Sequence, residues 1–195
     1  MTQDPVTRSP VTARQIYAEA LRILDDEGLG ALNARTLTAR LSCSTKTLYQ
    51  LVGNRDAMIR GIVAHAFAGM DLEFKPAPDW QSSVTSWART LHSALLARPY
   101  LGRLMTPEDR EATVGYVMRL VDVLVAHGFR TRTAIEVAGN VGHWTISSTL
   151  LDLRAPGEWD HPERFEATLD WLVRGIEQAS GPGPAPSTRR AGAPP

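Results

Sequence analysis

The sequence predicts an all-α protein, in which a small N-terminal domain of three helices precedes a larger helical domain. Apolar residues recur at three- and four-residue spacing along most of the chain, which is the period of an amphipathic helix. No stretch alternates apolar and polar residues between hairpin turns, as a half-buried strand would. The 195 residues are enough for one large or two small domains with a core of their own.

The first helix is expected over residues 12–27, after a flexible N-terminus of residues 1–11. Thr12 is a suitable N-cap, and Gly28 and Gly30 follow where the helix should end. The apolar stripe that identifies this helix consists of Ile16, Ala20, Ile23 and Leu24.

Two short helices joined by a tight turn are expected next. Asn33 would cap the first, which runs to about residue 41, and residues 42–44 would form the turn. Ser44 or Thr45 would cap the second, which runs to about residue 51. The apolar residues expected to hold the pair together are Leu37, Leu41, Leu48 and Val52.

The second short helix should present a polar face away from this apolar contact. A helix-turn-helix places such a helix in the DNA major groove. Gly53 then breaks the chain, and Asn54 caps a longer helix. We therefore interpret residues 12–60 as a helix-turn-helix DNA-binding domain, whose last helix continues as a connector to about residue 73. The outward side chains are Thr45, Lys46, Thr47, Tyr49 and Gln50, with Arg55 just beyond.

The charge distribution fits a modest DNA contact. The formal net charge is zero, which on its own argues against a nucleic-acid partner. Residues 1–60 hold eight Arg or Lys and six Asp or Glu, so this part is +2 (8 − 6) and the remainder is −2. Such a small asymmetry suits limited phosphate contact by a dimer and excludes a general nucleic-acid coat.

A larger domain is expected over residues 74–180, after the stiff linker at residues 75–78. The segment 181–195 is rich in Gly, Pro and Ala and should be disordered. The long helices expected between these limits cover residues 80–98, 106–126, 131–153 and 162–179.

Several classes of protein are excluded by what the sequence lacks. Cys43 is the only cysteine, so no internal disulfide can form, which suits the reducing cytoplasm. No apolar run reaches the ~18 residues of a membrane span, and the N-terminus is no secretory signal. The five histidines show no zinc spacing, and no catalytic or cofactor motif is present. We expect a cytoplasmic protein that is no enzyme and carries no metal or cofactor.

The chain resembles the TetR family of bacterial transcriptional regulators, most closely in the pattern of the tetracycline repressors. Residues 32–59 hold the most specific part, the ungapped spacing L-x-x-R-x-L-x-x-x-L-x-x-x-x-x-T-L-Y-x-x-V-x-N-[KR]. A second match, V-G-H-W-T at residues 141–145 followed by L-L-D, resembles the family's penultimate-helix motif. The resemblance covers nearly all of residues 12–179.

The resemblance implies roles in DNA recognition. Arg35 matches an arginine that reaches a guanine edge, and bidentate pairing supplies the chemistry. Leu51 departs from the family, where a histidine or tyrosine that contacts the DNA backbone is common, and Ser42 replaces the usual turn glycine. Thr47, Tyr49 and Arg55 match phosphate-contacting positions, and Thr45, Lys46 and Gln50 match base-reading positions. The predicted DNA-binding residues are Arg35, Ser44, Thr45, Lys46, Thr47, Tyr49, Gln50 and Arg55.

The resemblance also implies a homodimer, in which helices 131–153 and 162–179 pair with their copies in a four-helix bundle. Two recognition helices would then lie about 34–36 Å apart on a palindromic double-stranded operator. Apolar bulk would come from the last helix, through Leu169, Leu172, Val173 and Ile176. The small-residue face expected to allow close approach consists of Ala134, Ala138, Val141, Gly142, Thr145 and Ser148.

The ligand site implied by the resemblance is apolar and aromatic. Met105 and Leu151 occupy positions where tetracycline repressors hold a metal-binding histidine and an acid, so magnesium–tetracycline should not bind. We expect a small hydrophobic or aromatic effector instead. For Trp87 and Trp144, ordinary core packing is an equally good interpretation. The predicted ligand residues are Trp87, Leu91, His92, Met105, Thr106, Tyr116, Leu120, His143, Trp144 and Leu151.

These observations predict a ligand-responsive transcriptional repressor that releases its operator when the effector binds. The alternative is a helical protein that sequesters a small molecule without regulating transcription. Leu51 and the modest charge of the N-terminal domain leave this alternative open. Binding to DNA upstream of the gene separates the two.

Overall fold

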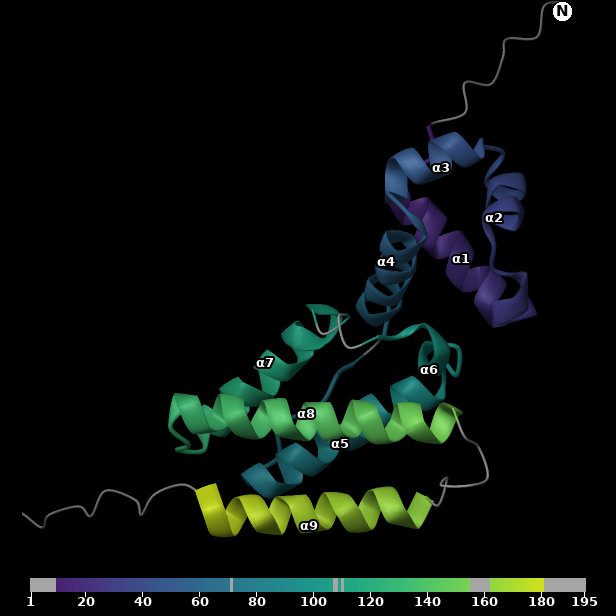
Figure 1. The fold of residues 1–195 in the computed structure, drawn as a ribbon. Helices are drawn as coiled ribbons and strands as arrows, with labels where there is room; N and C mark the ends of the chain where they lie inside the picture. The colour runs from purple at the N-terminus through teal and green to yellow at the C-terminus, as the bar shows by residue number, and fades with distance from the viewer. Residues whose placement is uncertain (1–9, 71, 107–108, 110, 155–161, 181–195) are drawn as a thin grey trace, which may run out of the picture. The chain divides into compact units, whose positions relative to one another are not determined.

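The computed structural model describes residues 10–70, 72–106, 109, 111–154 and 162–180. Every regular element among them is a helix (Figure 1), which confirms the predicted all-α fold. Contacts between elements divide the chain into two units: Met1–Asp71 with Arg98–Thr113, and Leu72–Ala97 with Val114–Pro195. None of the described helices combines the length and apolarity that crossing a membrane requires.

The first unit is built around α1 (Ala13–Glu27), which contacts α2 (Ala34–Leu41), α3 (Thr45–Val52) and α4 (Arg55–Ala68) (Figure 1). A short 3-10 turn, η1 (Leu29–Ala31), joins α1 to α2. Each of these helices is capped by the side chain that precedes it, which satisfies backbone N–H groups that have no partner within the helix. The capping residues are Thr12, Asn33, Ser44 and Asn54, as the sequence predicts, with Ser44 the observed one of the two candidates for α3.

The structure differs from the sequence prediction at three places in this unit. The fourth helix ends at Ala68 and not near Glu73. Its last turn tightens, since the N–H groups of Gly69 and Met70 donate to the carbonyls of Ala66 and Phe67, three residues earlier. The turn η1 was not expected. Neither was the four-residue helix α6 (Leu101–Leu104), which packs on α4 and joins the segment Arg98–Thr113 to the first unit.

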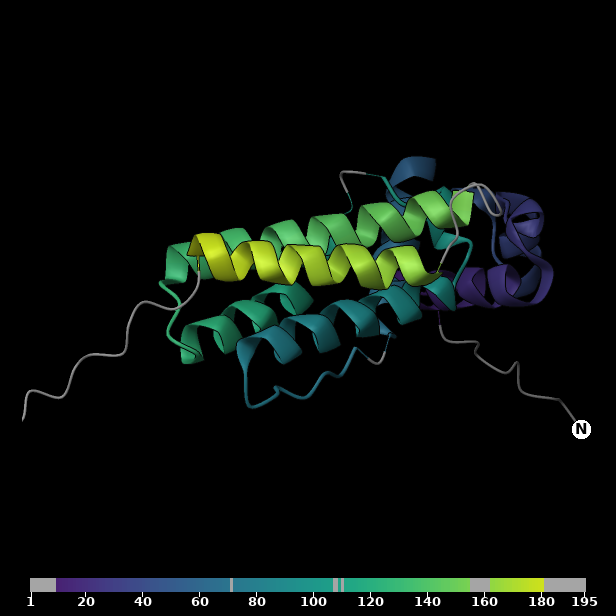
Figure 2. The same ribbon diagram turned by 90° about the horizontal axis from the view of Figure 1, so that it is seen from below.

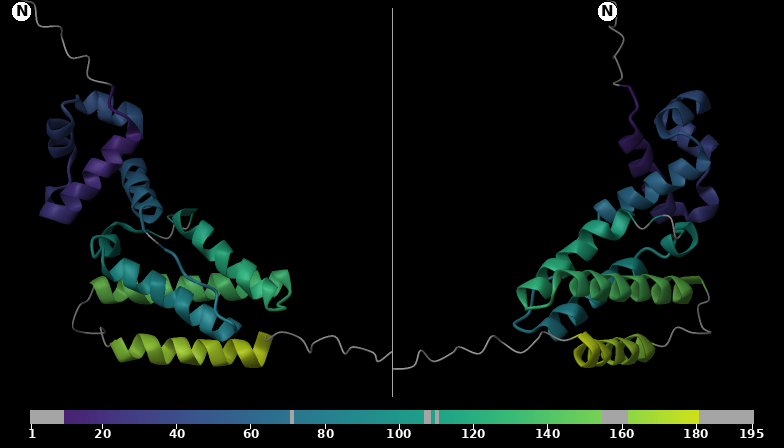
Figure 3. Two further views of the ribbon diagram at one scale, coloured as in Figure 1. Left: turned by 180° about the vertical axis from the view of Figure 1, so that it is seen from behind. Right: turned by 60° about the vertical axis from the view of Figure 1, so that its left-hand side comes forward.

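The second unit contains α5 (Trp80–Leu96), α8 (Thr131–Arg154), α9 (Pro162–Ser180) and, from Val114 onward, α7 (Glu111–Ala126). The helix α8 packs along α5, and α9 packs against both (Figures 2 and 3). The helix predicted from residue 106 begins at Glu111 instead. Two polar contacts tie α9 to α5: Arg89 with Glu166, and Gln81 with Glu177.

The small-residue face of α8 lies inside the chain, so its predicted contact with a second copy is wrong. Ala134, Ala138 and Thr145 are fully buried in one chain. A Cβ atom added to Gly142 would lie 3.3 Å from Trp87 of α5 and 3.3 Å from Val117 of α7. The small residues therefore allow close packing within the second unit, and a dimer would use other faces of α8 and α9. The predicted disordered tail, residues 181–195, and residues 1–9 of the N-terminus lie outside the described residues.

Candidate nucleic-acid interface

The turn between α2 and α3 determines the direction of α3. Ser42 adopts the left-handed conformation, with φ 51°, and is the one non-glycine residue at positive φ in the described part of the chain. The Cys43 N–H then donates to the Thr38 carbonyl at 3.1 Å. Ser44 Oγ accepts from the Thr47 N–H at 3.0 Å and caps α3. This turn reverses the chain within three residues, as the helix-turn-helix interpretation requires.

The helix α3 has one buried side and one polar side, as predicted. Leu48 and Val52 are buried and Leu37 of α2 faces them in the same core, whereas Leu41 is only half-buried. Leu51 adds an apolar side chain that is 40% exposed. We call the polar side the α3 polar face; it consists of exposed Thr45, Lys46 and Gln50 and half-buried Thr47 and Tyr49.

Two arginines among the predicted DNA-binding residues lie outside α3, near the starts of α2 and α4. Arg35 is exposed in the first turn of α2, after the Asn33 cap. Arg55 is exposed at the first position of α4, where Asn54 Oδ1 accepts from the Ala57 N–H at 2.8 Å. The N-terminus of a helix favours an anion, because its backbone N–H groups and its dipole both point outward there. Position, charge and exposure of both arginines fit contacts with DNA.

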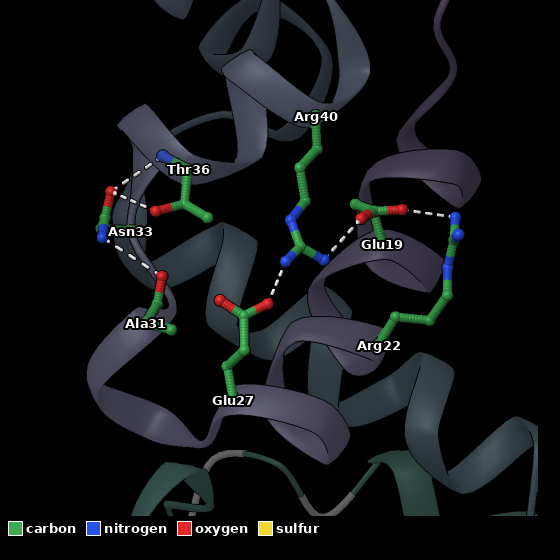
Figure 4. Close-up of polar contacts among 7 residues, drawn as sticks. All are labelled: Glu19, Arg22, Glu27, Ala31, Asn33, Thr36 and Arg40. Atoms are coloured by element: carbon green, nitrogen blue, oxygen red, sulfur yellow. Dashed lines mark hydrogen bonds and ion pairs between the residues drawn. The ribbon is translucent and has the colours of Figure 1, made fainter.

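A polar network that the sequence interpretation missed joins α2 to α1 (Figure 4). Arg40, in the last turn of α2, bonds Glu19 and Glu27 of α1, and Arg22 also pairs with Glu19. Glu27 ends the run Asp25-Asp26-Glu27, a pattern that is typical of a solvated helix end. One signal was available: Glu19 lies within the apolar stripe of α1, three residues after Ile16, and a buried carboxylate requires partners.

Among the predicted ligand residues, Trp87 and Tyr116 form a closed pair. Their rings stack with centroids 4.7 Å apart. Trp87 Nε1 donates to the Tyr116 carbonyl at 3.0 Å, and the Tyr116 hydroxyl donates to the Trp87 carbonyl at 3.0 Å. Burial raises the pKa of Tyr116 to about 12. The polar group of each side chain is thus bonded to the main-chain carbonyl of the other residue, which supports the core-packing interpretation of Trp87. Leu91 and Leu120 are fully buried as well.

A second cluster forms around Phe165 of α9, which was not among the predicted ligand residues. His92 of α5 stacks on Phe165 at 3.8 Å, and Trp144 of α8 stacks on it at 5.0 Å. The Nδ1 atom of His92 lies 2.8 Å from Thr149 Oγ1. Burial lowers the pKa of His92, while the charges of Asp152 and Glu166 oppose that shift.

The remaining predicted ligand residues differ in their burial. His143 is exposed and Leu151 is 52% exposed, so neither contributes to the core of the second unit. Met105 is buried and Thr106 is exposed, in the segment that belongs to the first unit. One further polar group is notable, since the Thr145 hydroxyl is buried without a hydrogen-bond partner. Across the described ranges, no group of His, Cys, Asp and Glu is placed to hold a metal ion.

Comparison with known proteins supports the interpretation of this chain as a transcriptional regulator. No family model matches the sequence. The chain is 28% identical over 142 residues to the class E tetracycline repressor protein of Escherichia coli, covering 69% of this chain and 65% of that protein. It is 23% identical over 159 residues to an HTH-type transcriptional regulator of Saccharopolyspora erythraea, covering 80% and 66%. The chain thus spans slightly less than two thirds of the length of these curated relatives.

Solved structures share the fold over nearly their whole length. The TetR family protein ActR of Streptomyces coelicolor, in complex with actinorhodin, gives a TM-score of 0.72 at 24% identity, covering 89% of this chain and 100% of that one. BioQ with its double-stranded DNA operator gives a TM-score of 0.68 at 19% identity, covering 86% and 99%. The arrangement of helices is therefore the one found in these regulators.

Proposed function

We propose that this chain, which belongs to the TetR family of transcriptional regulators, is a homodimeric repressor that binds a palindromic operator and releases it when a small effector binds. The observation that carries the proposal is the α3 polar face, held outward by a capped turn on a buried apolar back. A helix with this presentation fits the major groove. The neighbouring BioQ structure, which contains a DNA operator, supports the same use of the fold.

Direct contacts would divide between bases and phosphates. Arg35 would pair with a guanine, while Thr45, Lys46 and Gln50 of the α3 polar face would read neighbouring base edges. The remaining predicted residues would position the helix by contacting phosphates, which carry no sequence information. These are Ser44, Thr47, Tyr49 and Arg55.

Dimerisation would use faces of α8 and α9 that the chain leaves uncovered. Trp171 of α9 is 67% exposed, and Ile135 of α8 is 50% exposed. A Cβ atom at Gly139 of α8 or at Gly175 of α9 would meet nothing within 4 Å, so a second backbone can approach there. Burying such apolar side chains against a two-fold copy is favourable, and the symmetry would present two recognition helices to the two halves of a palindrome.

The effector is proposed to be a hydrophobic or aromatic small molecule that binds the second unit. Aromatic rings gather around Phe165 in this unit, and the buried, unpartnered hydroxyl of Thr145 would offer a ligand one polar contact. The ActR structure with actinorhodin is a precedent for a small-molecule complex in this fold. Release of DNA requires that the effector bind the released conformation more tightly. The helix α4 would transmit the conformational change to the DNA-binding helices, because α6, which follows α5 in the chain, packs on α4.

The proposal is tested by binding of the full chain to duplexes that cover the DNA upstream of its gene. We expect one duplex to bind tightly, with an affinity that falls as salt rises. Arg35→Ala should lose about 1–3 kcal/mol of discrimination at one base pair. Arg103→Ala removes the same charge from α6 and serves as the control. Sequence-independent binding, or no binding to any duplex, would refute the proposal.

Sequestration of a small molecule without DNA binding is the second candidate. Exposed Leu51 on α3 favours it, since this apolar residue stands where the family holds a polar contact with the DNA backbone. Under this candidate the chain would bind an aromatic ligand, and neither the wild type nor Leu51→His would shift any duplex. Operator binding by the wild type eliminates it.

A further inference from the structure

The helix α2 is held by little apolar packing. Leu37 is its one buried residue, whereas α1 buries five. Nevertheless α2 contacts both α1 and α3, and it carries the exposed side chain of Arg35. A helix of eight residues has little stability of its own, and one fully buried apolar side chain restrains its direction only weakly. Directional contacts should therefore contribute to the direction of α2.

Arg40 makes these contacts from the last turn of α2 (Figure 4). Its Nη1 atom donates to Glu19 Oε1 at 3.3 Å, and its Nη2 atom pairs with Glu27 Oε1. The two carboxylates come from positions eight residues apart on α1, which separates their backbones by about 12 Å along the helix. Because one planar guanidinium is bonded to two separated points on α1, it restrains both the position and the direction of α2.

Glu19 also shows why the bond is more than a surface ion pair. It is 6% exposed and lies in the buried stripe of α1, where a carboxylate without partners is costly. Arg22 pairs with Glu19 as well, but both residues belong to α1. Arg22 therefore neutralises the charge without linking two helices, whereas Arg40 neutralises it and links them. The two arginines form a matched contrast on one carboxylate.

We propose that Arg40 is a positioning residue for DNA recognition. By bonding Glu19 and Glu27 it holds α2 against α1, and through α2 it sets the placement of Arg35 and of the α3 polar face, without touching DNA itself. This inference rests on the proposed function. The competing role for an arginine at the exposed end of α2 is direct contact with a phosphate.

The test uses the full chain and a duplex of about 30 base pairs that the wild type selects from a random library, long enough for two half-sites. Arg40→Gln should weaken binding to this duplex about tenfold, comparable to the loss of one base contact. The slope of log affinity against log salt should stay unchanged, since a lost phosphate contact would reduce it by about 0.9. Arg22→Gln carries the same change of charge and should weaken binding less than about twofold.

The substitution Glu27→Gln tests the proposal through the direction in which DNA affinity changes. Removing this carboxylate makes the first unit more positive, so simple electrostatics predicts tighter DNA binding. The positioning role predicts the opposite, because Glu27→Gln removes one of the two bonds between Arg40 and α1. We therefore expect weaker binding to the selected duplex. Glu27→Gln keeps the Arg40–Glu19 bond, so it also serves if Arg40→Gln fails to fold, which thermal unfolding by circular dichroism reports.

The outcomes separate this inference from the proposed function. A wild type that selects no sequence overturns the proposed function and this inference with it. A wild type that selects a sequence while Arg40→Gln matches Arg22→Gln, or Glu27→Gln binds more tightly, overturns only the positioning role. A reduced salt slope for Arg40→Gln would assign Arg40 to a phosphate contact instead.

Discussion

The two units of the molecule rely on different kinds of contact. In the first unit the helices α2 and α3 have eight residues each, the starts of α1 to α4 are each capped by a side chain, and Arg40 bonds α2 to α1. In the second unit α5, α8 and α9 have 17 to 24 residues and enclose stacked aromatic rings. Hydrogen bonds are directional, whereas apolar burial depends on volume. The first unit is thus arranged to hold an orientation, and the second to supply stability.

The largest effect should come from the aromatic core of the second unit. Trp87→Ala removes a fully buried ring and leaves the Tyr116 carbonyl without the indole N–H that it accepts from. The free energy of unfolding should fall by about 3–5 kcal/mol, as for large buried aromatic residues. Chemical denaturation measures it. Leu96→Ala on the same helix changes an exposed side chain and should stay within about 0.5 kcal/mol. Similar losses from the two variants would contradict the comparison.

The next effect should come from the close approach of α1 and α4 in the first unit. A Cβ atom at Gly61 of α4 would lie 2.2 Å from the Tyr17 ring of α1, so Gly61→Ala must push the two helices apart or displace the ring. We expect a loss of about 1–3 kcal/mol, typical of overpacking. Gly115→Ala in α7 is the control, since a Cβ there meets nothing within 4 Å and alanine favours a helix by up to about 1 kcal/mol.

Rescue of the Gly61 variant distinguishes this clash from a general effect on α4. In the double variant Tyr17→Ala with Gly61→Ala, the free energies of unfolding should be non-additive, because the clash needs both side chains. Additive losses would show that Gly61 matters for a reason other than the approach of the Tyr17 ring.

Local signals in the sequence predicted much of the first unit. The four N-caps and the turn from Ser42 to Ser44 are read from single residue types, because each satisfies backbone groups within three residues of itself. The buried backs of α2 and α3 follow from helical period in the same way. The outward direction of the α3 polar face could therefore be predicted before any tertiary contact was known.

What the sequence left open depends on contacts between distant segments. The small-residue face of α8 was identified correctly as a face, but its partner is α5 of the same chain, and period alone cannot tell one apolar partner from another. Glu27 looked solvated because Arg40 lies thirteen residues further along the chain. The helix α6 has four residues, too few to show a period.

Two substitutions in the turn before α3 should change the free energy of unfolding in opposite directions. Ser42 has φ 51°, a conformation that costs a residue with a Cβ about 1–2 kcal/mol and costs glycine little. Ser42→Gly should raise the free energy of unfolding by about 0.5–1 kcal/mol, the gain being reduced by the flexibility of glycine in the unfolded chain. Ser44→Ala removes the cap of α3 and should lower it by about 1 kcal/mol. A loss from Ser42→Gly would show that its hydroxyl has a role of its own.

The smallest effect we expect is a pH dependence confined to the second unit. Thr149 Oγ1 donates to the Thr145 carbonyl at 2.6 Å, so toward His92 it acts as an acceptor and His92 carries its proton on Nδ1. Burial lowers the pKa of His92 below its ordinary value of 6.5. The unfolded chain therefore takes up the second ring proton, which makes the imidazole positive, more readily than the folded chain does. The free energy of unfolding should then fall as the pH drops from above 6.5 through the folded pKa.

Denaturation of the wild type and of His92→Gln at about pH 7.5 and about pH 5.5, on either side of the ordinary histidine range, measures the contribution of His92. The wild type should lose more stability on acidification than His92→Gln does, whereas His143→Gln, which changes an exposed histidine of α8, should follow the wild type. A wild type that gains stability relative to His92→Gln at the lower pH would show that Asp152 and Glu166 outweigh burial. In that case the second unit, like the first, would be held by directed charge contacts, and the contrast between the two units would fail at its aromatic core.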